Sequence, residues 1–280
     1  MDVSSRIAAI EASLTKAERR VAAVVLREPE LVAFRTVAAV AERAGVGAAS
    51  VVRFAVRLGV DGFGGLQQAV QADLSRRLRP AAERIRQEAG PDLVERHIAL
   101  ALENVASTLQ RLDTTALEDL VGRVADPSRR VGVLTGDASA GVARQLASDL
   151  QALRDGVQLL DGSEVAVGRQ LAAFGSDDIV LAIDLRRYDR QVVHAVTRAA
   201  GRGVWVAAFT DGPLSPLARH AAASFVVHAD AVGPFDSHVG TLALADLMVA
   251  LVADRMRDEA SARLDAAERV WRDHGMLVDE

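Results

Sequence analysis

Residues 36–58, TVAAVAERAGVGAASVVRFAVRL, indicate a helix, a tight turn and a second helix. The first helix carries an apolar stripe at helical spacing, formed by Val37, Val40, Ala41 and Ala44. Gly45 suits the position just past a helix end, where a positive φ is often required. In the second helix, the spacing of Val51, Phe54 and Leu58 predicts that these side chains face inward. The stretch therefore predicts a helical hairpin with one buried side.

The opposite side of the second helix is predicted to carry Ala49 and a polar stripe of Ser50, Arg53 and Arg57. Two short helices joined by a glycine turn, with arginines on the second, are what a helix-turn-helix needs to enter a major groove. We take these four residues as candidate DNA contacts, with Thr36 at the start of the first helix. The alternative is an ordinary helical hairpin whose arginines are only solvated, because short motif matches carry false positives.

The distribution of charge separates the chain into two parts. The 280 residues suffice for two domains, and half of them are hydrophobic. Residues 1–79 hold 12 basic and 8 acidic side chains, a net charge of +4, and the remaining 21 basic and 30 acidic side chains give −9. A basic N-terminal part on an acidic body is typical of a DNA-reading head joined to a separate domain.

Composition also narrows the class of protein. No cysteine is present, which excludes disulfides, cysteine nucleophiles and thiolate metal sites. No run of about 18 uncharged apolar residues occurs, so neither a membrane span nor a membrane partner is expected. The first residues, MDVSSRIAAIEASL, lack the apolar core of a secretory signal. These features predict a cytoplasmic protein.

The N-terminal part is predicted to be an all-α head at 1–79. We expect five helices in it, at 5–14, 15–27, 37–44, 48–58 and 66–78. A capping box of Thr15 and Glu18 opens the second helix, and Pro29 is expected to end it. The glycine-rich residues 61–65 are expected to form a loop. A linker at 80–92 then leads to a second domain at 93–280.

The second domain alternates apolar runs with helical stretches. Strands are expected at 131–135, 157–160, 179–183, 204–209 and 225–228, and the intervening helices at 139–153, 165–174, 189–200 and 214–223. This alternation predicts an open, doubly wound, parallel five-stranded sheet. Helices at 93–112 and 115–124 precede it, and a long helix at 239–257 follows. A tail helix to about residue 271 is either simple packing or a dimer contact.

Ligands of such sheets bind beyond the carboxyl ends of the strands, where three loops carry polar residues. The candidate effector-binding residues are Gly136, Ser139, Asp184, Arg186, Arg187, Ser237 and His238. The first loop combines a glycine with a helix N-terminus that offers N–H groups to an anion, and the arginines of the second can fork onto a carboxylate or phosphate. The alternatives are an ordinary N-cap in the first loop and an Asp–Arg network in the second.

Signals for catalysis are absent from the sequence. The six histidines show no paired metal spacing, and neither GxSxG, GxxxxGK[ST] nor GxGxxG occurs. We therefore expect no cofactor, no metal and no catalytic residues.

Both halves of the chain resemble the RpiR family of bacterial transcriptional regulators. In the head, LTKAERRVA at 14–22, AGVGAASVVRF at 44–54 and LGVDGF at 58–63 are similar to that family's opening helix, recognition helix and following loop. The second half resembles the sugar isomerase (SIS) domain, of flavodoxin-like fold, with DGPLSPLA at 211–218 matching a recurrent stretch. Two departures stand out, since Gly47 replaces a frequent serine and 184–189, DLRRYD, replaces a serine-rich phosphate loop.

The resemblance implies a homodimeric or homotetrameric regulator that binds a double-stranded DNA operator and senses a sugar phosphate. Because arginines replace the phosphate-loop hydroxyls, our hypothesis is an anionic carbohydrate-derived effector, a sugar phosphate or sugar acid, that meets Ser139 and Arg186 or Arg187. One alternative is a sugar-phosphate isomerase with an appended head, using Asp137, Glu164, Asp184 or His238 as its base. The other is a SIS module with a degenerate ligand site that serves assembly only.

Overall fold

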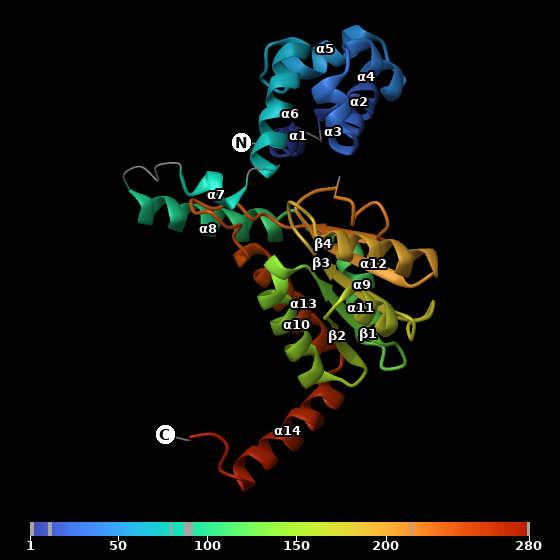
Figure 1. The fold of residues 1–280 in the computed structure, drawn as a ribbon, viewed down its shortest axis with the longest axis vertical. Helices are drawn as coiled ribbons and strands as arrows, with labels where there is room; N and C mark the ends of the chain where they lie inside the picture. Colours follow the sequence, from blue (N-terminus) through green and yellow to red (C-terminus); the bar gives the residue numbers. More distant parts are fainter. Residues whose placement is uncertain (1–2, 11–12, 79, 87–91, 214, 279–280) are drawn as a thin grey trace. The chain divides into compact units, whose positions relative to one another are not determined.

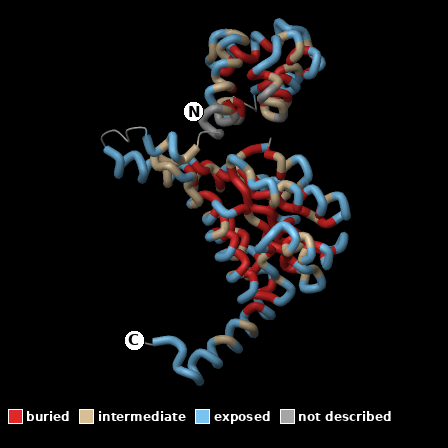
Figure 2. The backbone as a smooth tube through the Cα atoms, viewed as in Figure 1, coloured by how far each residue is buried: buried red, intermediate tan, exposed pale blue. Residues whose placement is uncertain are grey.

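The computed structural model describes the chain except residues 1–2, 11–12, 79, 87–91, 214 and 279–280. The chain separates into two compact units, Met1–Arg84 and Ile85–Glu280, each with its own buried core (Figure 2). Within the described residues, no helix is long and apolar enough to cross a lipid bilayer.

The first unit is helical throughout (Figure 1). Its helices are α1 (Val3–Ile10), α2 (Lys16–Arg27), α3 (Pro29–Phe34), α4 (Val37–Ala44), α5 (Ala48–Arg57), α6 (Gly62–Leu78) and α7 (Ala81–Arg84). The fully buried side chains at its centre are Val21, Val32, Val40, Val51, Phe54, Ala55 and Leu66. The core therefore joins helices α2 to α6, and the inward face predicted for α5 is confirmed.

Two local signals in this unit act as the sequence predicts. Thr15 and Glu18 form a complete capping box, in which each side chain accepts a hydrogen bond from the other's backbone N–H. Gly45 ends α4 in the left-handed region at φ 63° and donates to the carbonyl of Glu42. The tight turn between α4 and α5 therefore depends on a glycine.

One of two expectations about helix breakers in this unit is confirmed and one is wrong. Helix α2 ends at Arg27, just before Pro29, as predicted, and Pro29 also begins a further helix, α3, because in the first turn a missing N–H costs nothing. Residues 61–65 are not a loop, since α6 begins at Gly62. Gly65 is needed there because a Cβ would lie 3.3 Å from the Cβ of Val60, closer than most Cβ contacts. The described part of residues 3–78 therefore holds six helices rather than five.

The second unit is built on a five-stranded, all-parallel sheet, which confirms the predicted fold class. Its strands are β1 (Val131–Thr135), β2 (Val157–Leu160), β3 (Ile179–Ile183), β4 (Trp205–Thr210) and β5 (Ala223–Val226). Their order, β2-β1-β3-β4-β5, is the flavodoxin-like one, and the direction of the winding reverses between β1 and β3. The crevice at a reversal of this kind is where such sheets bind ligands.

Helices cover both faces of the sheet (Figure 1). The helices are α8 (Leu93–Leu109), α9 (Thr114–Val124), α10 (Ala140–Leu153), α11 (Glu164–Leu171), α12 (Arg190–Gly201), α13 (Val239–Arg255) and α14 (Arg257–Asp273). Odd-numbered residues of β3 pack with α9, α10 and α13, whereas its even-numbered residues pack with α11 and α12. This alternation explains why β3 is apolar at every position.

One predicted helix of this unit is absent. Residues 215–220 form turns, and Leu214 lies outside the described residues. The Ser215 hydroxyl accepts a hydrogen bond from the N–H of Leu217 across Pro216, a local bond that competes with helix formation. As a consequence β5 begins at Ala223, two residues earlier than expected.

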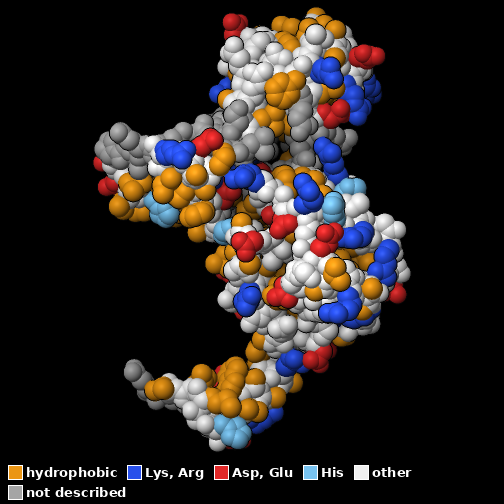
Figure 3. All heavy atoms as spheres, viewed as in Figure 1, with side chains coloured by type: hydrophobic (Ala, Val, Ile, Leu, Met, Phe, Trp, Pro, Cys, Tyr) orange, Lys and Arg blue, Asp and Glu red, His pale blue; other side chains and the backbone are white. Residues whose placement is uncertain are grey.

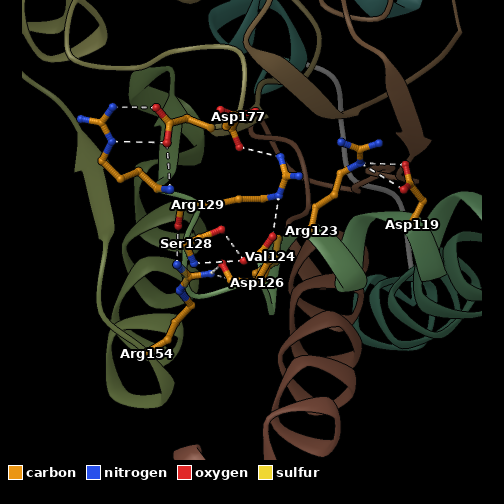
Figure 4. A network of polar contacts seen from close by, with 10 residues as sticks. Asp119, Arg123, Val124, Asp126, Ser128, Arg129, Arg154 and Asp177 are labelled. Atoms are coloured by element: carbon orange, nitrogen blue, oxygen red, sulfur yellow. Dashed lines mark hydrogen bonds and ion pairs between the residues drawn. The ribbon is translucent and has the colours of Figure 1, made fainter.

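A buried arginine organises the amino-terminal edge of the sheet (Figure 4). Arg154, which is 3% exposed, donates to the carbonyls of Val124, Asp126 and Arg129. It thereby satisfies carbonyls at the end of α9, which the helix itself leaves without partners. Because this edge is opposite the ligand-binding one, the cluster serves the fold, and the sequence alone gave no signal for it.

Helix α13 packs closely against α8 at Gly240. A Cβ on this residue would lie 2.7 Å from the carbonyl oxygen of His228 and 2.7 Å from Oγ1 of Thr108. Gly240→Ala should therefore destabilise the second unit by about 1–3 kcal/mol, as overpacking does. Gly168→Ala, at a helical position where nothing lies within 4 Å, is the matched control and should stabilise by about 0.5–1 kcal/mol.

Urea unfolding followed by tryptophan fluorescence measures this difference. Both tryptophans, Trp205 and Trp271, lie in the second unit, so the signal reports that unit alone. Equal stability of the two variants would contradict the packing described at Gly240.

Candidate functional site

Helix α5 exposes the side that the sequence predicted, with one difference. Ala49 and Arg53 are exposed and Ser50 is half-buried, and Nη2 of Arg53 donates to the Ser50 hydroxyl at 3.0 Å. The N-terminus of α5 has no side-chain cap, because Gly47 stands at that position. Thr36 is exposed, and its hydroxyl accepts the N–H of Ala39 at the start of α4. Arg53 is thus the outward cation of this helix.

Arg57 is turned back onto its own head. Its guanidinium lies 2.7 Å from Glu18 and donates to the carbonyl and hydroxyl of Ser13. Hydrogen bonds from Thr15, and then the charge of Arg57, hold the pKa of Glu18 below its usual value. The three residues of the predicted polar stripe therefore make different contacts. Ser50 and Arg53 are hydrogen-bonded to each other, whereas Arg57 links α5 to α2 through Glu18.

In the second unit, the N-termini of α10 and α13 meet at the carboxyl edge of the sheet. His238, the residue before α13, interacts with the backbone of Ala138, just before α10. Neither helix has a side-chain cap, whereas the adjacent α11 and α12 are capped by Ser163 and Asp189. Two sets of helix N–H groups therefore point to one place, where a negative charge is stabilised.

Buried hydroxyls without partners lie at the same two helix ends. Ser139 is 1% exposed and Thr241 is fully buried, and no protein group hydrogen-bonds to the hydroxyl of either one. Nδ1 of His238 is buried and also lacks a partner. Because buried polar atoms are nearly always satisfied, these three are groups that a ligand or water completes. Thr241 was not among the predicted site residues, although a hydroxyl in the first turn of a helix after a loop is a readable signal.

His238 is held neutral in this position. Burial lowers the pKa of its imidazole, and this outweighs the opposing effects of the Asp236 carboxylate and the Ala138 backbone. A neutral ring has one N–H donor and one acceptor nitrogen, and because Nε2 donates to the backbone of Ala138, Nδ1 is left as an acceptor for a ligand. Ser237, its neighbour, is half-buried and donates its N–H to the carbonyl of Ala229.

The loop after β3 is held by Asp184 and lies against the first loop. Asp184 is 3% exposed, and its carboxylate accepts the N–H groups of Leu185 at 3.0 Å and Asp189 at 2.7 Å. A Cβ on Gly136 would lie 3.1 Å from Oδ1 of Asp184, so the first loop needs a glycine. Asp184 thus holds the backbone of this loop in place, and both of its oxygens are already used in backbone hydrogen bonds.

Arg186 belongs to an Asp–Arg network within the chain. Such a network is the alternative to ligand binding that the sequence left open for this loop. Its guanidinium lies 2.7 Å from Asp230 and 3.3 Å from Asp236. Asn104 of α8 in turn holds the backbone of Asp230 through two hydrogen bonds. Arg186 therefore links the loop after β3 to the segment before α13, whereas the side chain of Arg187 is exposed. Both arginines have positive φ, 25° and 52°, a strained conformation that the surrounding bonds maintain.

Burial, with smaller contributions from the charges of Asp189 and Asp211, raises the pKa of Asp184 from 3.8 to about 6. Because the folded state binds this proton more tightly than the unfolded state, stability from Asp184 is present below pH 3.8 and is lost as the pH rises through 6. A shift of this size corresponds to roughly 3 kcal/mol. The stability of Asp184→Asn relative to the parent chain should therefore rise between pH 4 and pH 6.5 and then level off.

Urea unfolding at a series of pH values measures this difference. Asp137→Asn, at an exposed position in the neighbouring loop, is the control and should show no such rise. A pH-independent difference for Asp184→Asn would show that this carboxyl is ionised at ordinary values.

Comparisons with known proteins agree with both halves of this description. The helix-turn-helix domain of the rpiR family matches residues 1–77, and the SIS domain matches residues 127–251. An HTH-type transcriptional regulator of Haemophilus influenzae is 26% identical over 273 residues, 93% of each chain.

Two solved structures are similar as well. The sugar isomerase domain of an RpiR transcription factor from Sphaerobacter thermophilus is 31% identical, with a TM-score of 0.57, covering 63% of this chain and 98% of that one. NanR of Vibrio vulnificus, solved with ManNAc-6P, covers 99% of this chain and 100% of its own, at 21% identity and a TM-score of 0.59, which shows the shared fold. The chain belongs to the RpiR family of transcriptional regulators, with a helix-turn-helix head followed by a SIS domain.

Proposed function

We propose that this regulator binds its operator through the outward side of α5 and that its SIS domain senses an anionic, carbohydrate-derived metabolite. The observation that carries the effector assignment is the pair of uncapped helix N-termini with the unpartnered Ser139 and Thr241 hydroxyls. The regulator acts in the cytoplasm, where its DNA target lies.

The anionic group of the effector sits between α10 and α13. The N–H groups of both helices and the two hydroxyls supply hydrogen bonds to it there, and Nδ1 of His238 can accept one from a ligand hydroxyl. Arg186 is paired with Asp230 and Asp236 at the wall of the site, and its buried Nε, which has no partner among the described residues, can also donate to the ligand. ManNAc-6P, the ligand of NanR, has the anionic group and hydroxyls that this arrangement favours.

Self-association follows from the apolar face of α8 and α13. The exposed apolar residues of α8 are Leu93, Val94, Ile98 and Leu102, and hydrophobic side chains gather over this helix (Figure 3). Its neighbour α13 has Asp246 as its sole charged residue between Val239 and Ala253, yet Leu242 and Leu251 are exposed. A helix that is apolar on every side is normally covered. We infer that a second copy covers this face, giving a homo-oligomer with paired heads for a two-fold symmetric operator.

Two of the four candidate bases for an isomerase are already engaged within the fold. Both oxygens of Asp184 accept backbone hydrogen bonds, and Glu164 lies on the outer surface of α11, paired with Arg198. Together with the helix-turn-helix head, this favours a regulator that binds its carbohydrate ligand over an isomerase.

The two arginines of α5 are expected to behave differently on substitution. Arg53→Ala should weaken binding of a duplex selected from a random-sequence pool and reduce its salt dependence by about one counterion, because an outward cation is lost. Arg57→Ala should instead lower the thermal stability of the head, since its contacts with Glu18 and Ser13 are internal. Fluorescence anisotropy at several salt concentrations and scanning calorimetry separate these effects. Unchanged affinity of Arg53→Ala at matched salt would count against α5 as the DNA-contacting helix.

The effector site is tested with a panel of sugar phosphates and sugar acids, ManNAc-6P included, in a thermal-shift assay. The ligand that stabilises the full chain should bind Ser139→Ala and Thr241→Val with roughly tenfold lower affinity each, because each loses about 1.5 kcal/mol of charge-assisted hydrogen bonding. Arg169→Ala, at an exposed position of α11 outside the three loops, is the matched control. Equal calorimetric affinities for all four chains would place the ligand elsewhere.

A further inference from the structure

The outward side of α5 is unusually apolar for a helix that meets DNA. Val52 is 39% exposed and Val56 is 60% exposed, and Ala48 and Ala49 next to them are exposed as well. The opposite side holds the buried Val51, Phe54 and Ala55 of the head's core. Surface helices normally carry charged or polar residues on their outer side, so the two valines are an exception within this helix.

Few polar groups remain on this side of α5 to read DNA bases. Arg57 is held by Glu18 and Ser13, and the Ser50 hydroxyl accepts a hydrogen bond from Arg53. The outward surface of α5 is therefore mainly methyl groups around the guanidinium of Arg53, with the paired side chain of Arg57, 38% exposed, at its end. In the major groove, the apolar feature of the base edges is the C5-methyl group of thymine, which apolar side chains contact directly.

We propose that Val52 and Val56 read the C5-methyl groups of thymines in each operator half-site. This inference rests on the proposed role of α5 as the recognition helix. The two valines are four residues apart, about 6 Å along the helix axis, which corresponds to roughly two base-pair steps. Arg53 lies beside both valines and carries the charge for a phosphate or guanine contact. The half-site is thus read by shape and methyl contact as much as by hydrogen bonds.

The test uses the full chain and a duplex selected by it from a random-sequence pool. Each thymine of the duplex is replaced in turn by deoxyuridine, which removes the methyl group and leaves the base-pairing edge unchanged. The parent chain should lose about fourfold in affinity at one or two positions of each half-site, because burial of a methyl-sized group is worth ~0.8 kcal/mol. At those positions Val52→Ala or Val56→Ala should bind both duplexes equally well.

Val165→Ala is the matched control, because Val165 is 81% exposed in the SIS domain and should keep the full preference for thymine. Circular dichroism verifies that the variants fold, as expected for substitutions at exposed positions. If the parent chain does not distinguish thymine from deoxyuridine, or if both valine variants keep its preference, the inference is wrong. The proposed function survives that result provided that a specific duplex is selected and Arg53→Ala weakens its binding. If no duplex is enriched, the proposed function fails together with the inference.

Discussion

The N-termini of α10 and α13 are held next to each other at one edge of a parallel sheet, and the proposed effector site depends on this arrangement. The topology brings the ends together, because every loop after a strand emerges at the same edge. Gly136 lets the first loop approach Asp184, and Gly240 lets α13 approach α8. Because both helix ends lack a side-chain cap, they offer backbone hydrogen-bond donors, to which we assign the proposed effector.

The fold was predictable from the sequence wherever the hydrophobic residues follow a single regular spacing. The run at 179–183 is apolar at every position because β3 is covered on both faces, and the regular spacing of Val51 and Phe54 follows from one buried side of α5. The errors came where glycine or proline has more than one use. Pro29 follows the end of α2, as predicted, but also begins α3, and Gly65 lies inside α6, where Val60 packs closely against it.

The site was predictable in its loops but only partly in its residues. Sequence places the loops at 135–139, 184–189 and 235–238 at one edge, because strand order and direction follow from the alternation of elements. The sequence does not reveal which charged residues form ion pairs when they lie far apart along the chain. Arg57 pairs with Glu18, 39 residues away, and Arg186 with Asp230, 44 residues away, so each of these arginines has a partner within the fold that the sequence did not indicate.

Hydrogen–deuterium exchange of the full chain, with and without the stabilising sugar phosphate or sugar acid, tests the central claim most directly. In the first turns of α10 and α13, the amides of Ser139, Ala140 and Leu242 already donate to Gly136, Asp137 and His238. The amides at 141–142 and 239–241 are the ones that a helix start leaves without acceptors, so they should exchange readily in the free chain. The account predicts that ligand slows exchange at both of these helix ends together. Protection confined to other segments, or to one of the two ends alone, would contradict it.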